Sequence, residues 1–343
     1  MIFIMQPIHR TLPLILFVIL VTSSLSGLAQ EFSTTLSKSE VEKIIASSCA
    51  TCHGSAMSGA TRAPDFFHLS SMTPRSIVAS LESGRMQVQG SVLSEEERIA
   101  VAEYLTNRRY EPKKPPTNMC DAPPTSFSDV HYFGWGGNHS STGFIDELVA
   151  GLTKRDVPNL KLKWAFGFDG GTVTRTKPAV VDNHLIFGTQ FAEIYCVNME
   201  TGCVAWVAEA HSMIRGGVAI SEDVGAGIHA YVADFGGNVL SIDITSGEIL
   251  WETIVKNDPN NAVTGTPVYY DGMLYVPLTS MEVVTAGDDA ATCCVSSGQV
   301  VAVNAETGEE VWRHRVIQEE AKRFGTNRKG NPNFGPSGAP VWS

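Results

Sequence analysis

The feature that most constrains the fold is a short motif that occurs three times in the second half of the chain. Each copy reads as a strand, a turn of the form Asn/Asp-x-x-Thr/Ser-Gly, a second strand and a Trp. The glycine supplies the positive φ that the turn needs, so each copy predicts a β-hairpin. The copies lie at residues 195–206, 240–251 and 301–312.

The tryptophans that end these hairpins give the spacing of the repeat. Trp206, Trp251 and Trp312 follow Trp164 at intervals of 42, 45 and 61 residues. Intervals in the forties, with four short strands per unit, are typical of propeller blades. The sequence therefore predicts an all-β propeller over residues 129–343. An inner strand that begins at or near a proline recurs at 177–181, 266–270 and 339–342.

The last copy of this inner strand stops at Ser343, in the middle of a blade. Blades bury their faces against their neighbours, and an open half-blade exposes an unpaired edge. We therefore expect the chain to be a piece of a longer protein. A natural end after three blades would need a capping element, and the sequence contains none.

A second motif, C-x-x-C-H, lies near the N-terminus at residues 49–53. Two thiols three positions apart can each add to a haem vinyl group, and the following histidine then lies under the iron. Zinc would require a second pair of ligands nearby, and thiol–disulfide exchange a βαβ setting; neither is present. The motif predicts haem c held by Cys49 and Cys52, with His53 as axial ligand, in a helical domain over 36–110.

Met86 is the predicted second axial ligand of the iron. It ends a Gly-x-Met loop, and Ser94 with Glu97 forms a capping box that starts a closing helix at 95–107. This order resembles that of the small class I cytochromes c, although Gln87 stands where that family has Pro. Filling both axial positions makes the haem an electron carrier. The rival ligands, which fit a role in the core better, are Met57, Met72 and His68.

The first 29 residues predict a signal peptide. His9 and Arg10 precede a short apolar run at 12–21, and small residues lead to a cleavage site after Ala29. The run is too short for an ordinary membrane span, with an uncleaved anchor as the alternative. We expect a periplasmic or secreted protein with no membrane span after cleavage. The net charge of −11 leaves no basic surface for nucleic acid.

A proline-rich stretch at 111–128 predicts a stiff, extended linker between the two domains. Cys120 lies within it and is either disulfide-bonded or free. Cys196 and Cys203 flank one hairpin turn; they either bridge across it or are two small buried residues. The sequence does not decide between these alternatives.

Two adjacent cysteines, Cys293 and Cys294, fall in the longest interval between tryptophans. An oxidised pair closes a small strained ring, which is tolerated where the surroundings fix it, often at a binding site. Two free buried thiols, or two cysteines that pair elsewhere, are the alternatives.

Together these motifs resemble the pyrroloquinoline quinone (PQQ) dehydrogenases with eight-bladed propellers. The resemblance is greatest to the polyvinyl alcohol dehydrogenase (cytochrome) family, which fuses an N-terminal cytochrome c domain to the propeller. The residues that carry it are the C-x-x-C-H domain, segments 150–153 and 157–166, the three Trp-ended turns, and Ser280-Met281-Glu282 with the cysteine pair. The resemblance implies a small all-α class I cytochrome c domain followed by about half of an eight-bladed propeller.

The resemblance also implies a cofactor site. Cys293 and Cys294 would form a disulfide that stacks on PQQ, and Glu282 would hydrogen-bond to the quinone edge. Relatives often carry an Arg before the glycine that follows the cysteines, whereas Ser297 stands here. The Ca²⁺ ligands, a stacking Trp and the catalytic Asp lie in later blades of the family. The catalytic residues are therefore unknown in this chain, which alone is expected to be inactive.

The implied activity is oxidation of an alcohol at PQQ beside Ca²⁺, with electrons passing to the haem and then to an external acceptor such as a soluble cytochrome. The alternative is a non-catalytic electron-transfer or binding protein with a quinone-free propeller, against which Glu282 and the cysteine pair argue. Membrane-assembly lipoproteins share similar turns, but the signal region has no lipobox Cys.

Overall fold

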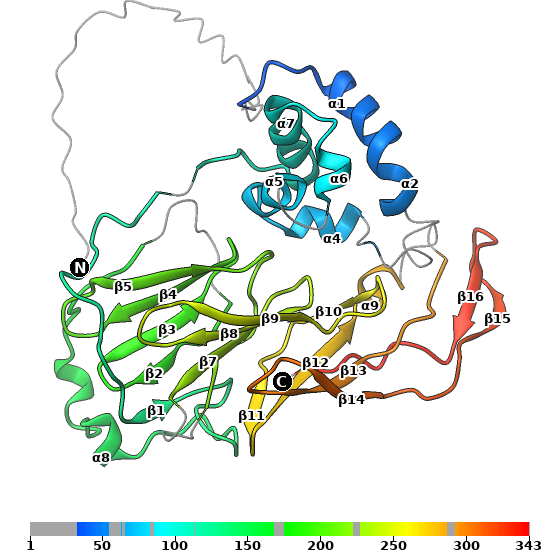
Figure 1. Cartoon of the computed structure of the whole chain (residues 1–343). Coiled ribbons are helices and arrows are strands. Elements are labelled where there is room, and N and C mark those ends of the chain that lie inside the picture. Colours follow the sequence, from blue (N-terminus) through cyan, green and yellow to red (C-terminus); the bar gives the residue numbers. More distant parts are fainter. Residues whose placement is uncertain are drawn as a thin grey trace, which may run out of the picture. The chain divides into compact units, whose positions relative to one another are not determined.

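The computed structural model describes residues 33–54, 63, 66–82, 86–112, 114–167, 175–221, 227–286 and 292–342. The chain divides into two units, Met1–Glu31 and Phe32–Ser343, and the description below concerns the second. Helices come first and antiparallel sheets follow, as the sequence predicts (Figure 1). The predicted signal peptide lies outside the described residues. No helix within the described ranges is long and apolar enough to cross a membrane.

The helical domain is built on two helices that begin with a capping box. In each, a serine accepts from the backbone of a glutamate three residues on, and that glutamate accepts from the serine backbone. The first and last helices of the domain share an apolar cluster that includes Val41, Ile45 and Val101. The helices are α1 (Lys38–Ile44), η1 (Ile45–Cys49), α2 (Ala50–His53), α4 (Phe66–Ser71), α5 (Pro74–Glu82), α6 (Gln87–Gly90) and α7 (Glu95–Thr106).

A buried carboxylate joins the two ends of this domain. Glu103 on α7 is fully buried and accepts hydrogen bonds from the backbone and hydroxyl of Ser33, at 2.9 and 2.6 Å. It also accepts from the backbone N–H of Tyr110 at 2.7 Å. Buried charges persist where hydrogen bonds compensate them, so Glu103 fixes where the domain begins and ends. The helix α7 ends at Thr106, one residue before its predicted end, because Asn107 adopts a left-handed conformation and caps it.

Three antiparallel sheets of four or five strands follow, each made largely of neighbours in chain order. The first contains β1 (Val130–Tyr132), β2 (Ala179–Val181), β3 (His184–Gly188), β4 (Glu193–Asn198) and β5 (Val204–Glu209). The second contains β6 (Ala219–Ile220), β7 (His229–Ala233), β8 (Asn238–Asp243) and β9 (Ile249–Ile254). The third contains β10 (Asn261–Ala262), β11 (Val268–Tyr270), β12 (Met273–Ser280), β13 (Gln299–Asn304) and β14 (Glu310–Arg315).

Short elements surround these sheets. Two short helices, α8 (Glu147–Ala150) and η2 (Val157–Asn159), lie in the connection from β1 to β2. A third, α9 (Glu282–Thr285), follows β12, and the chain ends with a hairpin of β15 (Lys322–Thr326) and β16 (Pro332–Gly335). The inner strand predicted at 339–342 is wrong, because these residues form no strand. Gly338 instead makes an isolated parallel bridge with Ser297.

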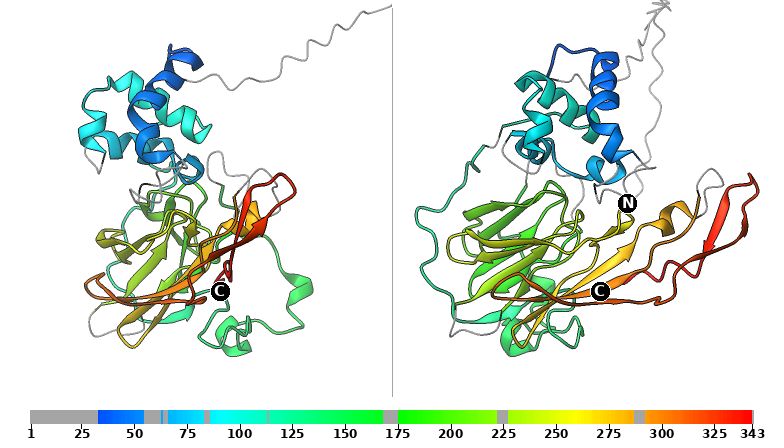
Figure 2. Two further views of the ribbon diagram at one scale, coloured as in Figure 1. Left: turned by 90° about the vertical axis from the view of Figure 1, so that its right-hand side faces the viewer. Right: turned by 45° about the vertical axis from the view of Figure 1, so that its right-hand side comes forward.

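The sheets pack face to face in chain order (Figure 2). Side chains such as Ile186, Ile194 and Leu240 fill the space between the first and second sheets. Tyr231, Leu274 and Val276 fill the space between the second and third. Successive sheets that bury both faces against neighbours are the packing of propeller blades.

All three predicted hairpins are present, as β4–β5, β8–β9 and β13–β14. Their turn glycines, Gly202, Gly247 and Gly308, have φ values of 75°, 78° and 76°. Each glycine lies against the tryptophan of the preceding repeat. A β-carbon at Gly247 would lie 2.7 Å from the Trp206 ring, so no side chain fits there.

The indole N–H of each covered tryptophan also bonds to the next turn. Trp164 donates to the Met199 carbonyl at 2.8 Å, and Trp206 donates to the Ile244 carbonyl at 2.7 Å. Trp251 donates to the Ala305 carbonyl at 3.1 Å. The recurring Gly and Trp of the motif are therefore the two halves of one contact between consecutive sheets.

Candidate cofactor sites

The C-x-x-C-H motif spans the junction of η1 and α2. Cys49 ends η1, and Cys52 and His53 lie on the single turn of α2. The imidazole of His53 is buried, Cys52 is exposed, and Cys49 is half-buried in the cluster between α1 and α7. Burial raises the pKa of the Cys49 thiol. Two thiols that can bond to haem vinyl groups and a buried imidazole that can bind iron lie on adjacent turns, which suits a covalently bound haem.

The candidate second ligands occupy different surroundings. Met86 precedes α6 and packs with Met72 against a cluster formed by Ile77, Leu81 and neighbouring residues. The His68 ring is buried and lies 6.0 Å from the Phe235 ring, in the connection between β7 and β8, which fits a packing role. Met57 and the Gly-x positions before Met86 lie outside the described residues.

The cysteine pair forms a disulfide between Cys293 and Cys294. We call residues 293–297 the cystine turn. It lies in the connection between β12 and β13, and the segment 332–338 runs parallel to it. Cys293 donates to the Pro332 carbonyl at 3.3 Å and accepts from the Phe334 N–H at 2.7 Å.

Glu282, at the start of α9, holds the other side of this turn. Its carboxylate is buried and accepts from the backbone of Val295 at 2.9 Å and from the backbone and hydroxyl of Ser296 at 2.6 and 2.5 Å. The carboxyl group that was expected at a quinone edge is thus engaged with its own chain.

Ser297, at the position where the family resemblance implies an arginine, is itself bound internally. It is buried, and its hydroxyl accepts from the Ile317 N–H at 3.0 Å. Asp258 lies in the same region, where burial raises the pKa of its carboxyl and the negative charge of Glu282 raises it further. In the ranges that the structure describes, no group of three or more His, Cys, Asp and Glu could hold a metal ion.

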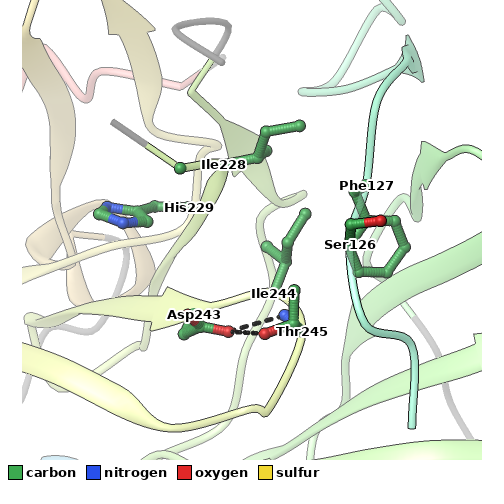
Figure 3. A pocket seen from close by; sticks show the side chains of 8 residues that line it. Ser126, Phe127, Ile228, His229, Asp243, Ile244 and Thr245 are labelled. Carbon is green, nitrogen blue, oxygen red and sulfur yellow. Dashed lines mark hydrogen bonds between the residues drawn. The ribbon is translucent and has the colours of Figure 1, made fainter. Parts of the chain in front are cut away.

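A separate pocket of about 220 Å³ lies between the linker and the second sheet (Figure 3). Its wall includes Phe127, His229 and Ile244. Asp243 also lines it, but its carboxylate accepts from the Thr245 N–H at 2.8 Å and serves the hairpin turn. This pocket contains neither the cystine turn nor the C-x-x-C-H motif.

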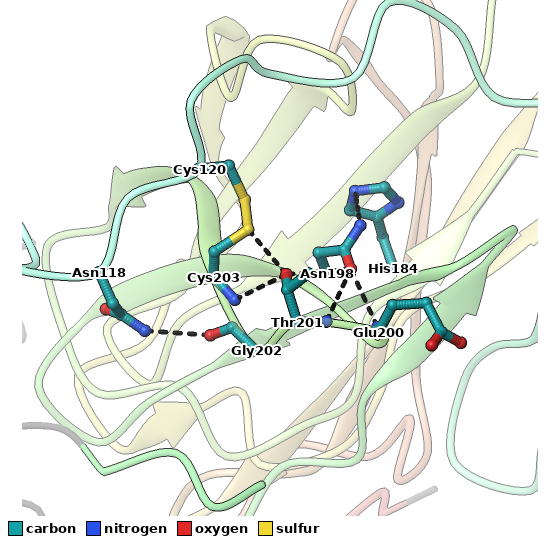
Figure 4. The surroundings of a disulfide bond; sticks show 8 residues. All are labelled: Asn118, Cys120, His184, Asn198, Glu200, Thr201, Gly202 and Cys203. Atoms are coloured by element: carbon teal, nitrogen blue, oxygen red, sulfur yellow. Dashed lines mark hydrogen bonds between the residues drawn. A yellow bond between two sulfur atoms is a disulfide. The ribbon is translucent and has the colours of Figure 1, made fainter. Parts of the chain in front are cut away.

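The linker is fastened to the first sheet by a disulfide that sequence reasoning left open (Figure 4). Cys120 bonds to Cys203, in the turn between β4 and β5, which excludes the alternative of a bridge between Cys196 and Cys203. Cys196 is a fully buried thiol. The backbone of Cys120 also donates to the Val204 carbonyl at 2.8 Å, which extends the edge of β5 by a short parallel bridge.

The helical domain contacts the first two sheets within the same compact unit. Arg75 on α5 forms ion pairs with Glu209 at 2.8 Å and Glu193 at 3.1 Å. All three side chains are largely buried, and the two carboxylates raise the pKa of Arg75 although burial lowers it. The Ser71 and Ser212 hydroxyls lie 3.0 Å apart.

These contacts lie at one end of the strands. Phe235, which packs on α4, belongs to the connection between β7 and β8. The cystine turn belongs to the connection between β12 and β13, the equivalent connection in the next sheet. Because equivalent connections of consecutive blades share one end of a propeller, the helical domain and the cystine turn lie at the same end.

Two family models match the chain. Residues 152–328, more than half of it, match a propeller family described as outer membrane protein assembly factor BamB, and residues 37–105 match cytochrome c oxidase, cbb3-type, subunit III. Fold and matches together define a cytochrome c domain joined to a PQQ-type propeller.

The chain belongs to this PQQ propeller family and is similar over most of its length to polyvinyl alcohol dehydrogenases. It is 29% identical to "Polyvinylalcohol dehydrogenase" of a Pseudomonas species, over 86% of this chain and 48% of the relative. It is 28% identical to the protein of that name from Sphingopyxis sp. (strain 113P3), over 88% of this chain and 48% of the relative. Identity to "Quinohemoprotein alcohol dehydrogenase ADH-IIG" of Pseudomonas putida is 26%, over 54% of this chain and 26% of the relative. The chain thus spans about half the length of the first two relatives.

Proposed function

We propose that the chain is part of a quinohaemoprotein alcohol dehydrogenase that works in the periplasm or outside the cell. It oxidises hydroxyl groups of an alcohol or polyalcohol at PQQ and passes the electrons to haem c and then to an external acceptor such as a soluble cytochrome. The observation that carries the proposal is that a C-x-x-C-H helical domain contacts the end of the propeller that bears the cystine turn. That arrangement favours short-range transfer between two redox groups.

In this proposal Cys49 and Cys52 would hold the haem through thioether bonds, and His53 and Met86 would bind its iron. A bound haem c would accept and release single electrons. Because the His53 imidazole is buried, it would keep water from its side of a bound iron. The half-buried Cys49 sulfur would anchor the group against the core between α1 and α7.

The quinone would lie against the disulfide of the cystine turn. When bound there, PQQ would supply two-electron oxidation of the alcohol, and the haem would accept the electrons one at a time. The chain's own part is to present a rigid apolar sulfur surface, fixed by Glu282 on one side and by residues 332–338 on the other. Ca²⁺ belongs to the proposal by family resemblance alone.

One observation favours a second candidate, an electron-transfer or binding protein without a quinone. The Glu282 carboxylate already accepts hydrogen bonds from Val295 and Ser296. A propeller with this group engaged internally has one polar contact fewer to offer a cofactor.

The test separates the two candidates with the exported protein. Covalent haem is expected to survive denaturing electrophoresis and to show the absorption bands of a reduced c-type cytochrome, and to be lost in a C49A/C52A variant. PQQ is expected to quench tryptophan fluorescence saturably. In a protein that carries the complete propeller, PQQ and Ca²⁺ should permit alcohol-dependent dye reduction. Normal haem without PQQ binding would favour the second candidate.

A further inference from the structure

Glu282 makes more hydrogen bonds to one short segment than any role at a cofactor edge requires. Both oxygens lie within 3.0 Å of the Val295 N–H, and one oxygen also accepts from the Ser296 N–H and hydroxyl. The side chain is 7% exposed. Hydrogen bonds to an ionised carboxylate are among the stronger ones in proteins, and these all fix the two residues that directly follow the disulfide.

Ser296 is the point at which several contacts meet. Its hydroxyl lies 2.7 Å from the Ser280 hydroxyl at the end of β12. Its carbonyl accepts from the Gly338 N–H at 2.8 Å. Ser296, the second residue after the disulfide, is therefore held by β12 and Glu282 on one side and by Gly338 on the other.

The cystine itself is held by weaker bonds between neutral groups. Cys293 and Cys294 contact the 332–334 segment through backbone hydrogen bonds of 3.3, 2.7 and 3.5 Å, and the Cys294 sulfur lies 4.0 Å from the Glu282 carbonyl. A loop whose side chains and backbone make few bonds opens often by local fluctuation. What limits that fluctuation here is the anchor one and two residues further on.

We propose that Glu282 is a positioning residue, whose carboxylate clamps Val295 and Ser296 and so fixes the cystine turn before any cofactor binds. Glu282 then acts on the quinone through the disulfide surface that it holds still, and does not bind the quinone edge. This inference rests on the proposed function for its meaning, but the clamp itself is a property of the cofactor-free protein.

The experiment measures how fast the cystine is reduced in the cofactor-free protein. A dithiol reductant is added, thiols are alkylated at intervals, and peptides that contain Cys293-Cys294 are quantified by mass spectrometry. The E282Q variant keeps the size of the side chain but loses its charge, and its amide N–H₂ opposes two donors. Its cystine should be reduced at least about fivefold faster than that of the wild type, because the turn opens more often. The Cys120–Cys203 disulfide, measured in the same samples, should keep its rate.

PQQ titration of the same variants distinguishes the clamp from a direct contact. The clamp predicts that weaker PQQ binding in E282Q accompanies faster reduction of the cystine. An unchanged reduction rate together with weaker PQQ binding would instead make Glu282 a direct ligand and overturn the proposal. Faster reduction in a chain whose wild type binds no PQQ would support the clamp and reject the quinone function.

Two further variants guard against a general loss of folding. S296A removes only the hydroxyl donor and should raise the reduction rate by about twofold, in the same direction as E282Q. E306Q changes an exposed glutamate in the next turn and should change neither rate. Equal rates in S296A, E306Q and the wild type would contradict the clamp even if E282Q fails to fold.

Discussion

Trp206 and Trp312 end the first and third copies of the hairpin motif, and their surroundings differ. Trp206 is 5% exposed, because the following turn covers it with Gly247 and accepts its indole hydrogen bond. Trp312 is 43% exposed, and no described turn lies over it. The comparison shows that burial of this tryptophan comes from the next hairpin and not from its own. In this contact, each sheet therefore covers the tryptophan of the sheet that precedes it in the chain.

The largest expected effect comes from removing the covered tryptophan. Trp206→Ala should lower the free energy of unfolding by about 3–5 kcal/mol, because it empties a packed site and removes a buried hydrogen bond. Trp312→Ala should cost less, about 1–2 kcal/mol, because 43% of that residue stays exposed. Urea denaturation of both variants measures the difference. Equal losses would refute the directional contact.

The next effect concerns an attachment that only the first sheet has. Cys203 bonds to the linker, whereas the equivalent turn positions in the other sheets are Glu248 and Glu309. Cys203→Ser should cost about 2–5 kcal/mol, since the disulfide closes a loop of more than eighty residues. Glu248→Ser is the matched control and should change stability little. Thermal unfolding of the oxidised proteins measures the loss of stability. Similar melting temperatures for the two variants would contradict a stabilising role of the disulfide.

Steric contact at the turn glycine gives the third prediction. Gly247→Ala combines a left-handed backbone with a β-carbon 2.7 Å from the Trp206 ring. We expect a loss of about 2–4 kcal/mol from strain and overpacking together. Gly330→Ala shares the positive φ but meets no atom within 4 Å, so it should cost about 1–2 kcal/mol. Chemical denaturation of the pair isolates the contribution of the tryptophan contact.

The smallest effect is a dependence on pH that only the second hairpin shows. Burial opposes ionisation of Asp243, but hydrogen bonds from Thr245 and Ser246 outweigh it and hold the pKa of the carboxyl below its usual range. Its contribution to stability is complete above the unfolded-state pKa and is lost as pH falls through the lower folded-state pKa. Asp243→Asn, which copies Asn198 and Asn304, should remove less than about 1 kcal/mol of acid sensitivity below about pH 4. Melting temperatures between pH 2 and 6 test this, and an unchanged slope would contradict it.

Local patterns were sufficient to predict the hairpins and the main helices. The turn from Asn198 to Gly202 and the capping box at Ser94 specify their elements through bonds between residues close in sequence. The predicted fold class is confirmed as well. It could be predicted because each repeat carries the same local hairpin motif, and the spacing of these motifs can be read directly from the sequence. The assignments of Cys49, Cys52, His53 and Met86 to a haem stay predictions.

Contacts between distant residues could not be read from the sequence. Cys203 had a nearer candidate partner in Cys196, yet the structure joins it to Cys120 across the linker. Strand alternation explains this, because the side chain of Cys196 points into the core between the first two sheets. The parallel approach of 332–338 to the cystine turn was missed for a similar reason. Its residues form backbone bonds that no side-chain pattern reveals.

The burial of Cys196 has a consequence for sulfur chemistry in this chain. Loss of solvation raises the pKa of this thiol to about 12, so only about one molecule in 10⁵ carries the thiolate at neutral pH. The thiolate is the species that attacks a disulfide, and the Cys120–Cys203 bond lies in the same hairpin. Folding thus makes Cys196, the free thiol in the same hairpin as Cys203, a poor nucleophile toward that bond.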